Sequence, residues 1–152
     1  MDREELLRRY AAGERDFSGV SLRGLDFSDC DLSGINLSNA DLESTEWEGA
    51  DLSEANLSGA FLAYSGLNNA NLTEANLSRA RLQDCALSGA NLTDACVRGT
   101  LFGNEPHLKR ANLTGVDLSQ AVIDLPGGID NPRIDNAILC DTTLPNGENW
   151  TI

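Results

Sequence analysis

The chain has 152 residues, with 24 acidic against 11 basic side chains and a formal net charge of −13. This length indicates one domain, and the charge argues against direct binding of nucleic acid or of an anionic membrane, because both carry like charge. The longest apolar runs are a few residues, far short of the roughly 20 that span a bilayer.

Residues 1–13 are expected to form a short amphipathic helix that caps the rest of the chain. Asp2 is a candidate N-cap with Glu5 three residues on, and Gly13 is a candidate stop. The residues that share one apolar face of this helix are Leu6, Leu7, Tyr10 and Ala11. Charged residues interrupt the segment, so it has no signal-peptide core and we expect no export.

Beyond Gly13 a large apolar residue recurs at every fifth position, without interruption from Phe17 to Phe102. Two residues before each one stands a mostly small residue such as Ala40 or Ala50, and a spacing of two places both on one side of an extended segment. The residue between them is usually Asp or Asn, and the next is usually Ser or Thr, which favours tight turns. One pentad buries too little to be stable alone, so the repeats are expected to stack into a solenoid with a continuous core.

The pentads resemble the A(D/N)LXX signature of the pentapeptide-repeat family, as in ADLSEANLSGA (50–60) and ANLTEANLSRA (70–80). The resemblance runs from Asp16 to Leu144, and the ending LCDTTLPNG (139–147) with a helical N-terminus is similar to small cyanobacterial members. It implies an all-β solenoid, a right-handed quadrilateral β-helix with four pentads per turn and about six and a half turns, preceded by the short N-terminal capping α-helix.

We expect three parts: a capping helix (1–13), a pentapeptide-repeat β-helix (14–144) and a C-terminal tail or cap (145–152). The register of five slips near 103–107 and again near 124–133. The two ends of a β-helix expose unpaired backbone. The tail, with Trp150 and Ile152, is expected to cover the C-terminal end, and a homodimer through one end of the rod stays open as an alternative.

Every fourth large residue falls on the same ladder of the expected coil. The first ladder is Phe17, Leu37, Leu57, Leu77, Val97, Leu118 and Leu139, and the third is Phe27, Trp47, Leu67, Leu87, Leu108 and Ile129. Trp47 is a tight fit, for which the small Thr45 makes room. Lys109 and Arg110 then fall on the third side and Arg133 on the fourth.

The sequence offers little for catalysis, so we expect no enzyme, no cofactor and no metal. The only His, His107, lies in the first slip, where a solvent-exposed His is more common than a catalytic base. The ladders separate the cysteines beyond the Cα distance of about 7 Å that a disulfide allows. Free thiols at Cys30, Cys85, Cys96 and Cys140 indicate a reducing cytoplasm.

Charge distribution is the feature with the most functional content. Ten acidic residues and no Lys or Arg lie between Gly24 and Arg79. The candidate partner surface within this stretch is Asp26, Asp31, Glu46, Glu48, Asp51 and Glu54. Charge that only keeps the rod soluble is the simplest interpretation of this pattern.

The leading functional hypothesis is a non-enzymatic protein–protein interaction module that presents this rigid acidic surface to a protein partner, which the sequence does not identify. The alternative follows from the resemblance, because family members that bind DNA gyrase resemble duplex DNA in shape and charge. It is a DNA-mimic modulator of gyrase or of another duplex-binding enzyme, and it requires an acidic stripe along the whole rod.

Overall fold

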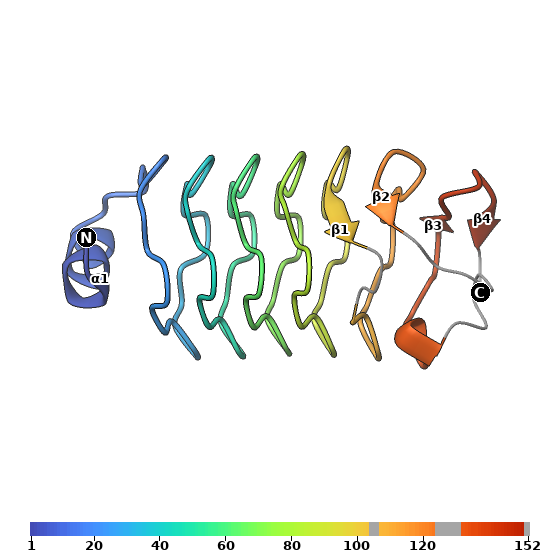
Figure 1. Cartoon of the computed structure of the whole chain (residues 1–152), viewed down its shortest axis with the longest axis horizontal. Helices are drawn as coiled ribbons and strands as arrows, with labels where there is room; N and C mark the ends of the chain where they lie inside the picture. The colour runs from blue at the N-terminus through green and yellow to red at the C-terminus, as the bar shows by residue number, and fades with distance from the viewer. Residues whose placement is uncertain (104–106, 124–131, 151–152) are drawn as a thin grey trace.

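The computed structural model describes residues 1–103, 107–123 and 132–150. A helix at the N-terminal end is followed by stacked turns of chain that advance along one axis toward the C-terminus (Figure 1). The regular elements are the helix α1 (Arg3–Ala11), the strands β1 (Leu101–Gly103), β2 (Val122–Ile123), β3 (Thr142–Thr143) and β4 (Asn149–Trp150), and the 3-10 helix η2 (Pro132–Ile134). Most pairing between turns is made by isolated parallel bridges instead.

Backbone pairing between residues 20 apart defines each turn of the coil. Asp16 pairs with Asn36, and Asn36 pairs with Asn56, both in parallel. Twenty residues are four pentads, so the turn contains four pentads and the chain folds as a β-helix of stacked pentapeptides.

Each pentad consists of a short extended segment and one tight turn. The N–H of Ala40 donates to the carbonyl of Leu37 at 3.1 Å, and the turn residue Asn39 has a φ of 57°, which together define a type II β-turn. The Oδ1 of Asn36 accepts from the N–H of Ser38 at 3.1 Å and supports the same turn. The predicted roles of the Asp or Asn and Ser or Thr positions in tight turns are therefore confirmed.

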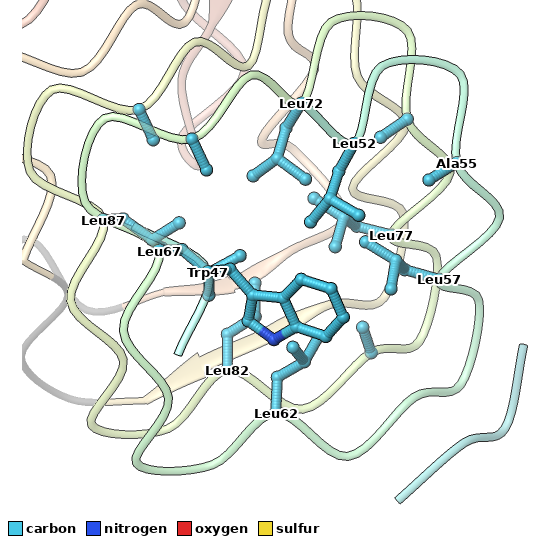
Figure 2. Packing of buried hydrophobic residues seen from close by; sticks show 14 of the residues in the cluster. Trp47, Leu52, Ala55, Leu57, Leu62, Leu67, Leu72, Leu77, Leu82 and Leu87 are labelled. Atoms are coloured by element: carbon cyan, nitrogen blue, oxygen red, sulfur yellow. The ribbon is translucent and has the colours of Figure 1, made fainter. Parts of the chain in front are cut away.

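The core is one continuous stack of inward side chains. Figure 2 shows residues of the first ladder (Leu57, Leu77) and third ladder (Leu67, Leu87) entering from opposite sides, as do those of the second (Leu62, Leu82) and fourth (Leu52, Leu72). Trp47 is fully buried, and its ring stacks on that of Phe27 with centroids 4.7 Å apart. Its Nε1 donates to the Oγ1 of Thr45 at 2.7 Å, so Thr45 supplies both space and an acceptor.

Helix α1 covers the first turn of the coil. The side chain of Asp2 accepts from the N–H of Glu5 at 2.8 Å, which confirms the predicted N-cap. Leu6 is fully buried, and Leu7 and Tyr10 pack against the same core. The remaining residue predicted on this face, Ala11, is exposed, because it ends the helix.

The first slip adds one residue to a turn. Gly66 pairs with Ala86 at an offset of 20, whereas Ala86 pairs with His107 at an offset of 21. The pairing of β1 with β2 is also irregular between Leu101 and Gly103.

The second slip is larger than the sequence predicted. The N–H of Leu118 donates to the carbonyl of Thr143 at 2.8 Å, so Leu144 follows Leu118 on the first ladder. The prediction that Leu139 follows Leu118 is wrong, and Leu139 follows Leu113 on the fourth ladder instead. Paired residues are 26 positions apart here, which is one pentad more than the 21 positions between Ala86 and His107 at the first slip.

The third ladder needs the same correction. The N–H of Arg110 donates to the carbonyl of Asp135 at 2.9 Å, so Ile134 takes the place expected for Ile129. Ile129 lies outside the described residues, and the count of about six and a half turns, which included it, stays a prediction. Arg133 directly precedes a residue of the third ladder, not of the fourth.

At the C-terminal end, β4 pairs with β3 in antiparallel register, so backbone of the tail lies against the last turn. Ile152, predicted to help cover this end, lies outside the described residues. No helix in the described part of the chain has the length and apolar character to cross a membrane.

Candidate partner surface

The six predicted acidic residues lie on the third and fourth sides of neighbouring turns. Asp26 pairs with Glu46 on the third side, and Asp31 pairs with Asp51 on the fourth. Asp51 is half-buried and the other members are exposed. The acidic surface, as we call this set below, is Asp26, Asp31, Glu46, Glu48, Asp51 and Glu54.

Two of these carboxylates are stabilised in the charged form by their own turns. The N–H of Ser28 donates to Asp26 at 2.8 Å, and the N–H and hydroxyl of Ser53 donate to Asp51 at 2.9 and 2.6 Å. Hydrogen bonds from these serines lower the pKa of both carboxyl groups. Asp26 and Asp51 therefore stay ionised to lower pH than an ordinary Asp.

None of the ion pairs in the described part of the chain uses a member of the acidic surface. One cation does approach it: the Nε of Arg3 donates to the backbone carbonyl of Asp26 at 2.7 Å, and its charge contributes to lowering the pKa of that carboxyl. Sequence reasoning missed this contact, because Arg3 lies outside the repeat and its position depends on how α1 docks.

The paired positions of the acidic surface lose their charge on the next turn of the rod. On the third side Glu46 is followed by Gly66 and Ala86, and on the fourth side Asp51 is followed by the neutral Asn71. The carboxylate of Glu46 reaches over the next turn, where a Cβ on Gly66 would collide with it. The paired outward positions of both sides therefore become neutral after the second residue, whereas the turn position of Glu54 is followed by the exposed Glu74 and Asp94 on the next two turns.

The other residues singled out in the sequence lie apart from this surface. His107 is exposed, and all four cysteines are free. Cys85 is buried, its Sγ donates to the carbonyl of Leu62 at 2.6 Å, and burial raises its pKa to about 12. Within residues 1–103, 107–123 and 132–150, no group of three or more His, Cys, Asp or Glu is placed to hold a metal ion.

The second side carries exposed apolar groups that sequence reasoning missed. Phe61 and Tyr64 are 42% and 62% exposed, and the guanidinium of Arg81 lies 4.8 Å from the centroid of the Phe61 ring. The signal was present in the sequence, because Phe61 and Arg81 occupy positions where most pentads have Asp or Asn.

The comparisons with known proteins agree with this architecture. A family model for pentapeptide repeats matches residues 16–39, 35–65 and 67–104 with 8 copies. The chain belongs to the pentapeptide-repeat family. A comparison with curated proteins finds no match.

Two solved structures resemble this pentapeptide-repeat protein in fold. Rfr23, a pentapeptide repeat protein from the cyanobacterium Cyanothece 51142, gives a TM-score of 0.63 with 22% identity, over 89% of this chain and 97% of that chain. Full-length QnrB1, a plasmid-mediated fluoroquinolone resistance protein, gives a TM-score of 0.56 with 18% identity, over 86% of this chain and 68% of that chain. At these identities the likeness shows the fold alone.

Proposed function

We propose that this pentapeptide-repeat protein is a non-enzymatic interaction module that presents its acidic surface to a basic face of a protein partner. One observation carries the proposal: the six carboxylates point outward, and no ion pair among the described residues neutralises any of them. Electrostatic complementarity of this kind steers a partner of opposite charge and fixes its orientation.

The backbone that carries the acidic surface is held on both neighbouring turns. The N–H of Asp51 donates to the carbonyl of Cys30 on the preceding turn at 2.9 Å, and the N–H of Leu52 donates to the carbonyl of Asn71 on the following turn at 2.8 Å. A partner would therefore meet carboxylates whose spacing is already set, and little conformational entropy would be lost on binding.

The proposal also includes the handedness and cross-section of the coil and the compartment in which the protein works. The coil has the right-handed quadrilateral form of its family, and the protein works in the cytoplasm, where reducing conditions keep the exposed thiol of Cys96 free.

To test this, each Asp of the acidic surface is changed to Asn and each Glu to Gln, and capture of partners from the native host is measured by quantitative mass spectrometry. A matched control removes the same number of exposed charges elsewhere, at Glu4, Asp16, Asp84, Asp117, Asp141 and Glu148. We expect the surface variant to lose its partner and the control to keep it, with wild-type circular dichroism for both. Capture should also weaken as salt rises past about 0.15 M, where the screening length is near 8 Å. A surface variant that still captures the partner would contradict the proposal.

The DNA-mimic alternative requires negative charge along the whole rod. The neutral positions at Gly66 and Asn71 argue against it, and so does the exposed cation of Arg98 farther along. A DNA gyrase supercoiling assay with increasing amounts of protein tests it directly, and absence of inhibition at excess protein would eliminate it.

A further inference from the structure

A polar groove crosses the corner that follows the first ladder and extends to turns beyond the acidic surface. We call it the arginine groove, and the residues that line it include Asn39, Ser58, Gly59, Asn76, Arg79 and Arg98. Gly59 has no side chain, and the amide group of Asn39 lies over it, with its Oδ1 2.5 Å from where a Cβ on Gly59 would be. The acidic surface lies on the third and fourth sides, so the two features are spatially separate.

The two arginines of the groove occupy adjacent turns. The N–H of Arg79 donates to the carbonyl of Arg98 at 2.9 Å. The Cγ of Arg79 lies 3.5 Å from where a Cβ on Gly99 would be, so its stem extends toward the turn that carries Arg98. Two exposed guanidinium groups at one corner repel each other, and an anion between them would relieve that repulsion.

These arginines differ from most other cations of the chain in lacking a partner. Most other described basic side chains form an ion pair, donate to a carbonyl or cover an aromatic ring: Arg3, Arg8, Arg9, Arg15, Arg23, Arg81 and Lys109. For Arg79 and Arg98, no described residue offers a carboxylate within 4.0 Å or accepts a side-chain hydrogen bond. Their donors are available in a chain that has 24 acidic residues.

Asn76 adds a third donor. Its Oδ1 accepts from the N–H of Ser78 at 3.0 Å and from the hydroxyl of the same residue, which leaves its Nδ2 facing away from that turn. The equivalent amides on the fourth side are engaged, because the Nδ2 of Asn71 donates to Asp51 and that of Asn91 donates to Thr73. The Nδ2 of Asn76 has no acceptor among the described residues.

We propose that the arginine groove binds a phosphate group. A phosphate ester carries about 1.5 to 2 negative charges at pH 7 and has three strong acceptor oxygens, which match two guanidinium groups and one amide. Arginine is suited to this task because its planar donors pair with two phosphate oxygens at once. A single carboxylate offers one charge and two oxygens, and so satisfies fewer of these donors.

The test is an NMR titration of the isotopically labelled full-length protein with inorganic phosphate, at constant pH and ionic strength. We expect saturable shifts of the Nε–H signals of Arg79 and Arg98 and of the Nδ2 signals of Asn76. Arg79→Gln and Arg98→Gln should each weaken binding at least about tenfold, the loss typical of a charge-assisted hydrogen bond.

Arg110→Gln is the matched control, because Arg79 and Arg110 are both exposed turn residues with a φ of 59°. It removes the same charge from another side and should leave phosphate binding unchanged. Shifts that rise linearly without saturation, or an equal loss in the Arg110 variant, would overturn the proposal. Unchanged backbone spectra outside the substituted turns establish that each variant is folded.

Further titrations identify the source of the phosphate group. Tighter binding of O-phosphoserine than of inorganic phosphate indicates a phosphate ester on a larger ligand, and equal binding indicates free phosphate. Both outcomes support the site. Succinate, a dicarboxylate, should bind more weakly than either, and equal affinity for succinate would contradict the assignment to phosphate.

Discussion

Trp47 illustrates how one ladder position accommodates a side chain much larger than leucine. Its ring is nearly parallel to that of Phe27, at an angle of 14°, so it fills the core without separating the turns. Its indole N–H would be an unsatisfied donor in an apolar core, but Thr45 accepts from it, and Ser65 lies 3.2 Å from the same hydroxyl. The departure from the Ala-Leu pattern is therefore compensated within the same pentad and the next turn.

This compensation can be tested with Thr45→Val, which keeps the volume and removes the acceptor. The buried indole N–H then loses its partner, and we expect the free energy of unfolding in urea to fall by about 1–3 kcal/mol. In a Trp47→Phe background the same change should cost less, because no indole donor remains. Equal losses in both backgrounds would show that Thr45 acts on stability by another route.

Because its thiol is buried, Cys85 should make the free energy of unfolding depend on pH in the alkaline range. Burial raises the pKa of its thiol from an ordinary value of 9.0 to about 12, so folding favours the protonated form. Its contribution to stability is fully present below pH 9.0 and is lost as the pH rises toward 12. We expect urea unfolding to show this loss in the wild type and a smaller one in Cys85→Ala.

The same thiol provides a second measurement. In the native protein a thiol reagent should modify the exposed Cys96 and leave Cys85 unmodified, and denaturant should reveal all four thiols. An intramolecular disulfide in freshly prepared protein would contradict the separation of the cysteines by the ladders.

At the scale of elements, the period of five predicts which residues are inward and which turns are tight, because one large and one small residue per pentad must be buried. It does not predict how much chain leaves the coil at an irregular segment. Ile129 and Ile134 both keep the spacing of five, and only the pairing of Arg110 with Asp135 decides that Ile134 follows Leu108. Spacing alone cannot decide whether a pentad stacks or forms part of a connection.

Helix α1 was predicted as a cap, and Leu6 provides the test. We expect Leu6→Ala to lower the free energy of unfolding by about 2–5 kcal/mol, as for other buried leucines. Leu6→Glu should detach the helix and expose the first turn, whose open edge then promotes self-association detectable by light scattering. Ala11→Glu, an exposed change on the same helix, is the control and should remain like the wild type. A monomeric Leu6→Glu variant of unchanged stability would refute the capping role.

At the scale of the whole molecule, a constant core leaves the outward positions free to vary from turn to turn. The sequence therefore predicted that the acidic surface points outward, because its members occupy outward positions of the repeat. It did not predict the approach of Arg3 to Asp26 or the meeting of Arg79 with Arg98. The first depends on the docking of a helix outside the repeat, and the second on pairing between turns.

The stacked architecture also predicts that a central defect affects the whole rod. Leu72 is fully buried, and its N–H donates to the carbonyl of Asn91 on the next turn at 2.7 Å. Leu72→Asp places an unpaired carboxylate between turns that each depend on their neighbours, so we expect folding to fail. Asn91→Asp is the control, because Asp already occupies equivalent outward positions, and it should fold. Circular dichroism and thermal melting compare the two, and a Leu72→Asp protein with the wild-type spectrum and melting temperature would disprove the assigned register.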